Sequence, residues 1–199
     1  MWWARLLNSI VAFLNSGVAA STSAYESIAT TTVGSGGASS VTFSSIPSTY
    51  THLQIRILAR YTGTQNSGAP MYVRFNSDTG SNYSFHRVLG YANQSSSGVA
   101  AAGYATQTYM QAGYTSGGST TANMFSGQIV DILDYANTNK YKTIKSLGGY
   151  DTNTDTGYTS IGLYSGNWQS TSAVTSVTII PDTDNWAQYS SFALYGIKG

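Results

Sequence analysis

The sequence predicts an all-β protein, an antiparallel β-sandwich of jelly-roll type with a short N-terminal helix. Only 9% of the 199 residues are charged, whereas Ser, Thr, Gly, Asn and Tyr are abundant. From residue 41 onward, short runs of alternating apolar and polar residues are separated by polar, Gly-containing turns. This pattern is typical of sandwiches and barrels, and β-branched and aromatic residues fit the half-buried surface of a sheet. A chain of this length predicts one main domain.

Residues 1–16 are predicted to form an amphipathic anchor helix. Apolar side chains recur there at intervals of three and four residues, and Gly17 supplies a stop. Two adjacent indoles near the terminus favour docking on a partner, because exposed apolar patches usually mark interaction sites. The predicted anchor residues are Trp2, Trp3, Leu6, Leu7, Ile10, Phe13 and Leu14.

Three other interpretations of this segment stay open. Arg5 before an apolar run, with Val18, Ala19 and Ala20 after it, is typical of a secretory signal peptide, although Asn8 and Ser9 interrupt the run. A helix that packs on its own domain is a second alternative. A transmembrane span is disfavoured, since it needs about 20 consecutive apolar residues, and we expect no membrane partner.

Residues 17–40 are predicted to be a linker with a possible first strand around Tyr25, Ile28 and Val33. The sandwich domain is predicted to span residues 41–199. Its clearest strand places Leu53, Ile55 and Ile57 on one face, and only Leu58 breaks the alternation. Further strands are predicted around Met71–Phe75, Tyr83–Leu89, Gln128–Leu133, Tyr141–Leu147, Ile161–Leu163, Val174–Ile180 and Phe192–Ile197. Residues 93–121 are consistent with either a long loop or an extra hairpin.

Most chemistry-bearing groups are scarce in this chain. It has two His, one Glu, seven Asp and no Cys, and no nucleophile elbow, phosphate loop or paired-His zinc motif. We therefore predict a protein that is not an enzyme and has no cofactor, and we interpret His52 and His86 as strand-surface residues. A net charge of +1 disfavours nucleic acid as a partner, because phosphate binding needs clustered Lys and Arg.

Two weaker patterns suggest ligands. Asp151, Asn153 and Asp155, followed by Gly157, resemble a calcium loop, but the glycine comes one position late and the final Glu is missing, so turn-supporting roles are favoured. Trp168 and Trp186 lie near Asn and Gln residues, which suggests a glycan-binding site. The favoured alternative is that both indoles are partly buried at the core or contact other subunits.

Four blocks of the sequence carry a resemblance to a known group of proteins. They are VTFSSIPSTYTHLQIR at residues 41–56, VRFNSD at 73–78, NYSFH at 82–86 and YSSFALYGI at 189–197. With this order, the region from about Tyr25 to Gly199 resembles small virion structural proteins of tailed bacteriophages, of the tail-fibre-like or decoration type. The resemblance implies a β-sandwich subunit, a homotrimer, and other capsid or tail proteins as partners. It implies no catalytic or cofactor residues.

The leading hypothesis is a non-enzymatic virion subunit, assembled in the host cytoplasm and anchored by its N-terminus. The alternative is a carbohydrate-binding module of a tail fibre that recognises a host surface glycan through Trp168, Trp186 and the Tyr-rich residues 104–114. A secreted bacterial surface protein is a third hypothesis, and an enzyme is the least favoured.

Overall fold

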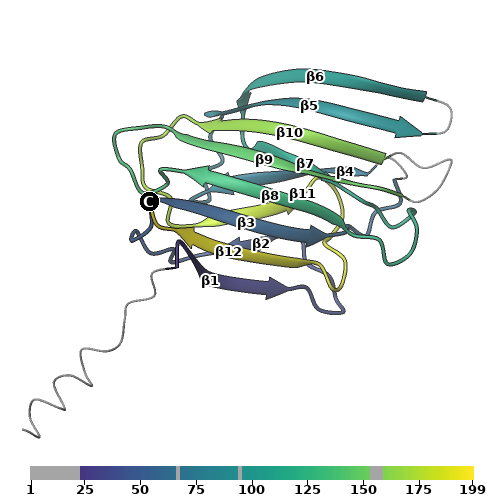
Figure 1. Ribbon diagram of the computed structural model, residues 1–199, viewed down its shortest axis with the longest axis horizontal. Helices are drawn as coiled ribbons and strands as arrows, with labels where there is room; N and C mark the ends of the chain where they lie inside the picture. Colours follow the sequence, from purple (N-terminus) through teal and green to yellow (C-terminus); the bar gives the residue numbers. More distant parts are fainter. Residues whose placement is uncertain (1–22, 66–67, 94–95, 153–158) are drawn as a thin grey trace, which may run out of the picture.

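A computed structural model describes residues 23–65, 68–93, 96–152 and 159–199, and this part of the chain is all-β, with two antiparallel sheets and no helix (Figure 1). It accordingly holds no helical segment with the length and apolarity that crossing a membrane requires. The predicted anchor helix at residues 1–16 lies outside the described residues. The prediction of an antiparallel sandwich is confirmed.

The larger sheet has eight strands in the order β1-β12-β3-β8-β9-β10-β5-β6. Each strand is antiparallel to its neighbours. The strands are β1 (Tyr25–Thr32), β3 (His52–Ala59), β5 (Tyr83–Asn93), β6 (Ser96–Gln107), β8 (Ser126–Leu133), β9 (Lys142–Tyr150), β10 (Thr159–Trp168) and β12 (Ser191–Ile197).

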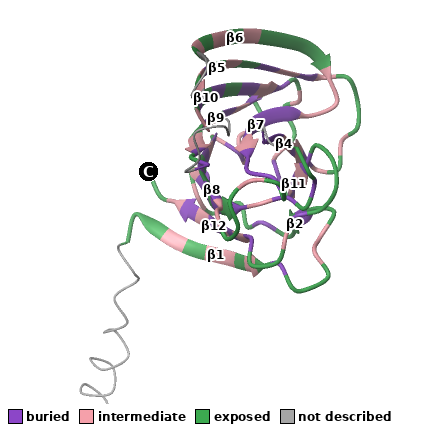
Figure 2. Ribbon diagram, turned by 90° about the vertical axis from the view of Figure 1, so that its right-hand side faces the viewer, coloured by how far each residue is buried: buried purple, intermediate pink, exposed green. Residues whose placement is uncertain are grey.

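The smaller sheet has four strands in the order β2-β11-β4-β7. They are β2 (Val41–Phe43), β4 (Ala69–Phe75), β7 (Met110–Thr115) and β11 (Val177–Pro181). Its edge strand β7 lies against β9 and β10 of the larger sheet. The strands β5 and β6 therefore extend beyond the smaller sheet, as the side view shows at its top (Figure 2).

The core lies between the two sheets and follows the alternation of the strands. Leu53, Ile55 and Ile57 of β3 face inward, as predicted, against Met71, Val73 and Phe75 of β4. Side chains at every second position of a strand share one face, so each inward position leaves its neighbours on the outer face. The outward residues of the larger sheet therefore decide what the molecule presents on that side.

Two segments that the sequence left open are strands. The possible first strand in residues 17–40 is β1, which pairs with β12 from Tyr25 opposite Ile197 onward. The larger sheet therefore includes part of the segment that was predicted to be a linker. Residues 93–121 contain all of β6 and all of β7. β6 forms a hairpin with β5, and β7 pairs with β4 in the smaller sheet. The region is therefore not one long loop, and its two strands do not form a hairpin with each other.

Candidate assembly surface

The structure buries both tryptophans that were candidates for glycan binding. Trp168 is 3% exposed and Trp186 is fully buried. The Trp168 indole N–H donates to Asp78 Oδ2 at 2.7 Å, and the Trp186 indole N–H donates to the Ile179 carbonyl at 3.3 Å. Neither ring presents a face to a sugar in solvent. The prediction of a glycan site on these two residues is therefore wrong, and the core alternative is correct.

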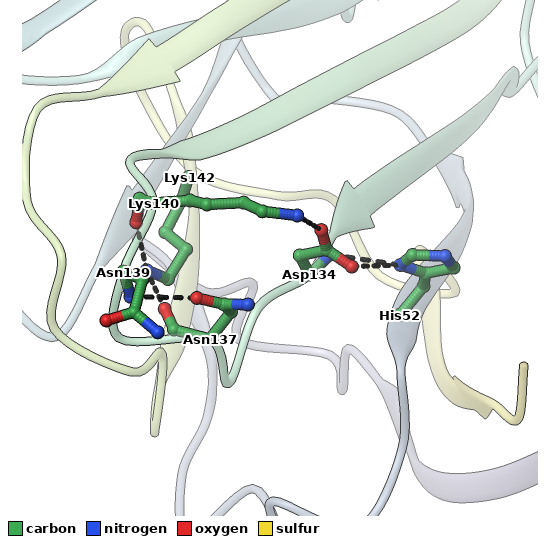
Figure 3. Close-up of polar contacts among 6 residues, drawn as sticks. All are labelled: His52, Asp134, Asn137, Asn139, Lys140 and Lys142. Carbon is green, nitrogen blue, oxygen red and sulfur yellow. Dashed lines mark hydrogen bonds and ion pairs between the residues drawn. The ribbon is translucent and has the colours of Figure 1, made fainter.

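His52 belongs to a polar cluster that fixes the loop between β8 and β9 (Figure 3). Its Nδ1 accepts a hydrogen bond from the Asp134 backbone N–H at 2.9 Å and lies 3.6 Å from Asp134 Oδ1. The Lys140 Nζ donates to Asp134 Oδ2 at 2.6 Å, and this bond lowers the pKa of the Asp134 carboxyl. His52 thus lies on β3 and accepts a hydrogen bond from the backbone of the loop that follows β8.

Lys142 completes this cluster from inside the protein. Its side chain is fully buried, and its ammonium donates to the carbonyls of Asn137, Lys140 and Thr171 at 2.6, 2.7 and 3.1 Å. All three donors of an ammonium are then used, which satisfies a charge that would otherwise be costly to bury. The burial of Lys142 could not be predicted from the sequence, because a lysine at the start of a strand gives no signal of burial.

No group of three or more His, Cys, Asp or Glu side chains with the arrangement of a metal site occurs in the described ranges. Three of the four positions of the suggested calcium loop, Asn153, Asp155 and Gly157, lie outside those ranges. His86, the second histidine, is exposed on β5 and its ring lies over Gly103 of β6, where a Cβ would come within 2.4 Å of it. Its position on the sheet surface agrees with the prediction.

The most distinctive surface is an apolar area on the outer face of the eight-stranded sheet, which we call the outer apolar patch. Seven aliphatic side chains that point away from the core form it, and each is between 44% and 75% exposed. Monomeric proteins rarely expose large contiguous apolar patches, and such patches usually mark interaction sites. The patch consists of Leu58, Val88, Val99, Ile129, Leu147, Ile161 and Leu163.

The strand register aligns these side chains in two rows. In the first row Val88, Leu163, Leu147 and Ile129 lie opposite one another across β5, β10, β9 and β8. Directly opposite side chains in antiparallel sheets are close neighbours. Four exposed aliphatic residues on four consecutive strands therefore form one continuous apolar ridge.

The second row alternates large side chains with glycine. It runs across six strands from β6 to β3, in the order Val99, Gly90, Ile161, Gly149, Gly127 and Leu58. A groove of about 420 Å³ lies over Gly127, and Leu58, Ile129 and Leu147 are among the residues that line it. The patch thus offers both ridges and a groove, which is the relief that interlocking side chains of a partner need.

Charged residues border the patch, and one of them, Arg56, lies opposite Ile129 and lines the groove. Lys145 and Asp131 lie opposite each other in the next row along β9 and β8. Asp131 accepts from the Gln54 amide at 2.9 Å, and Gln54 in turn accepts from the Arg56 guanidinium at 3.0 Å. The rows from β5 to β8 are therefore apolar, and the charged side chains lie at their border, as in a protein–protein interface with an apolar core and a polar rim.

The sequence holds a partial signal for this surface. Leu58 breaks the alternation of its strand because it occupies an outward position, where a polar residue is expected. Ile129, Leu147 and Leu163 occupy outward positions of β8, β9 and β10 in the same way. Aliphatic residues on both faces of several neighbouring strands indicate a sheet that is covered on both sides.

The fold defines the class of the protein as an all-β, two-sheet antiparallel sandwich. Comparison with known proteins goes no further, because no protein-family model matches the chain and no curated protein is significantly similar to it.

Proposed function

We propose that this protein is a non-enzymatic structural subunit of a tailed-phage particle, a fibre or capsid-decoration protein that packs against copies of itself. The observation that carries the proposal is the outer apolar patch, seven exposed aliphatic residues on one sheet face. A surface of this kind is unfavourable in water and is covered in an assembly. The resemblance of the four sequence blocks to virion proteins supports the same role, with the virion as its location.

The strand order supports a jelly-roll type of sandwich. Eight strands divide into β1-β12-β3-β8 in one sheet and β2-β11-β4-β7 in the other, and the chain crosses between these sets as it does in two Greek keys. The remaining strands are hairpin partners, since β5 pairs with β6 and β9 pairs with β10. These four strands widen the larger sheet beyond β8 and carry most of the outer apolar patch.

Three copies in closed symmetry are the assembly we favour, with the patch of each copy turned toward its neighbours. Closed symmetry lets every subunit cover the same surface without leaving a growing end. The segment of residues 1–16 then anchors the trimer to another capsid or tail protein.

The test is the mass of the full chain in solution, compared with that of a Leu147→Ser/Leu163→Ser double variant. Both side chains are about half exposed, so the variant keeps its core and loses two members of the ridge. We expect the mass of the variant to fall by a factor of three relative to the wild type. An unchanged mass would exclude the outer apolar patch as the trimer interface.

Glycan recognition by a tail fibre is the second candidate, at a different place from the one the sequence suggested. A cleft of about 210 Å³ opens under the β5–β6 hairpin. Tyrosine offers an apolar ring and a hydroxyl on one rigid side chain, which suits a sugar. The lining residues are Leu89, Tyr91, Ala100, Tyr114, Tyr150, Thr159 and Ser160.

An array of immobilised glycans tests this candidate with two matched variants. Tyr91 lines the cleft, whereas Tyr189 is an exposed tyrosine that does not line it. We expect Tyr91→Ala to abolish binding to a glycan that the wild type and Tyr189→Ala both retain. Absence of any bound glycan on the array would remove the candidate.

A further inference from the structure

We propose that the free edge of β6 pairs with β6 of a second copy, antiparallel and across a two-fold axis, so that two larger sheets become one. The inference concerns a sheet edge and is independent of the trimer interface. Within the described ranges β6 is the outermost strand of the eight-stranded sheet, with β5 on one side and no strand on the other (Figure 1). Such an edge presents unpaired backbone donors and acceptors to a further strand.

The other three sheet edges of the described structure are protected. β1 contains a register irregularity between Ser27 and Ala29 and carries Glu26, which is paired with Lys198. β2 has only three residues. These are the usual devices against edge pairing: irregularity, charge and shortness.

The edge strand β7 is covered by the β5–β6 hairpin of the larger sheet. The Arg87 guanidinium of β5 reaches over it and donates to the side chains of Gln111 and Tyr114 at 2.6 and 2.9 Å. The ladder between β7 and β4 is also irregular between Met71 and Tyr72. β7 is therefore closed to a further strand by both cover and shape.

Between Ser96 and Tyr104 none of these devices protects β6, because its register irregularity lies beyond that stretch, where the ladder passes from Phe85 to Tyr83. Its 12 residues, SSGVAAAGYATQ, include no charged residue and no proline. The ladder to β5 is regular from Asn93↔Ser96 to Phe85↔Tyr104. A long, regular and uncharged edge is a pairing site by the same criteria that explain the protection of the other three.

The register identifies which backbone groups are available. Asn93 and Ser96 are paired with two residues between them, so they close the hairpin as a hydrogen-bonded pair. Hydrogen-bonded and non-hydrogen-bonded pairs alternate along an antiparallel ladder. The N–H and C=O groups of Ser97, Val99, Ala101 and Gly103 consequently point away from β5, toward the open edge.

The chemistry of the edge favours a second copy as its partner. Two identical strands that pair across a two-fold axis bring residues of the same segment together, so any charge would lie close to its own copy. The absence of charge in β6 removes that repulsion. Its small residues, among them Ala100, Ala101 and Ala102, also let a second strand approach.

One register uses all the available groups. With the axis at Ala100, Val99 pairs with Ala101 of the second copy and Ser97 pairs with Gly103. The backbone groups of all four residues that point toward the open edge are then hydrogen-bonded in both copies. Val99 and Ala101 lie on the outer face, since they are paired with Gly90 and Val88, so the joined sheets present one continuous apolar surface.

Two measurements on the full chain test the edge. Ala101→Pro removes an outward N–H and leaves the β5 ladder intact, whereas Ala101→Ser keeps that donor. If copies associate through both the outer apolar patch and the β6 edge, light scattering should give six copies for the wild type and for Ala101→Ser. It should give three copies for Ala101→Pro. If copies associate through the β6 edge alone, the wild type and Ala101→Ser should be dimers and Ala101→Pro a monomer. The trimer proposal and the edge proposal can therefore fail separately.

Cross-linking gives a second readout. The chain has no cysteine, and the proposed axis places Ala100 opposite its copy in a non-hydrogen-bonded pair, at a separation of about 4.5 Å between Cα atoms, which a disulfide can bridge. Oxidised Ala100→Cys should run as a dimer without reductant, and Thr42→Cys on the edge of β2 should not. Equal masses for the proline and serine variants, with no selective cross-link at residue 100, would overturn the proposal.

Discussion

The indole N–H of Trp168 donates to the Asp78 carboxylate at 2.7 Å and ties the end of β10 to the turn after β4. Asp78 also accepts from the Gly80 N–H and the Asn82 amide, both at 2.8 Å. These bonds, first of all those from Asn82 and Gly80, lower the pKa of Asp78. One half-buried turn residue therefore holds a buried aromatic side chain in place.

This arrangement predicts a loss of stability in acid. Because the folded-state pKa of Asp78 lies below its unfolded value, the unfolded state binds the proton more tightly, and stability falls as the pH drops below about 4. Asp78→Asn should lower the free energy of unfolding at pH 6 and lose less of it between pH 6 and pH 3 than the wild type does. Urea unfolding at the two pH values checks this, and an equal loss in both proteins would contradict it.

Burial of Trp168 makes it a stability residue. Trp168→Ala should reduce the free energy of unfolding by about 3–5 kcal/mol, the usual cost of removing a large buried aromatic side chain. Tyr189→Ala is the control, since Tyr189 is exposed and its replacement should cost less than about 0.5 kcal/mol. Denaturant midpoints measure both, and similar values for the two variants would argue against the burial.

Lys142 should be the most sensitive of the charged residues in the cluster that includes His52. Lys142→Met keeps the apolar stem and leaves three backbone carbonyls without their donor, so we expect a loss of about 2–3 kcal/mol. Lys140→Met removes only an exposed ion pair with Asp134 and should cost less than about 1 kcal/mol. Thermal unfolding of the two variants at pH 7 distinguishes them, and a tolerated Lys142→Met would contradict the role of the ammonium.

A substitution at Gly127 should change the groove in the outer apolar patch without disturbing the fold. A Cβ at Gly127 meets no atom within 4 Å, whereas one at Gly149 would lie 2.1 Å from the Ser160 carbonyl oxygen. Gly127→Val should therefore fold normally, fill the groove and weaken self-association at least tenfold. Sedimentation over a range of concentrations measures the association, and an unchanged constant would exclude the groove from the interface.

The sequence predicted the strands whose inward residues are large. Leu53, Ile55 and Ile57 gave β3 its strong alternation, and β4, β8 and β12 were found in the same way. β6 could not be assigned, because its alternating residues are Ala, Gly and Ser and differ little in hydrophobicity.

The candidate sites were predicted less well than the strands. Trp168 and Trp186 were suggested as ligand-binding residues because they neighbour polar residues in sequence, but those neighbours point to solvent while the indoles point to the core. The outer apolar patch joins residues from six strands, and their alignment depends on a register that the sequence does not state. Only Leu58 gave a local sign of it.

Light scattering on the full chain and on the Leu147→Ser/Leu163→Ser variant decides whether the protein assembles through its outer apolar patch. We expect a wild-type mass of at least three times the 21.1 kDa of one chain, and one third of that mass for the variant at the same concentration. A wild type that stays at 21.1 kDa at every concentration would contradict the claim that this protein is an assembly subunit.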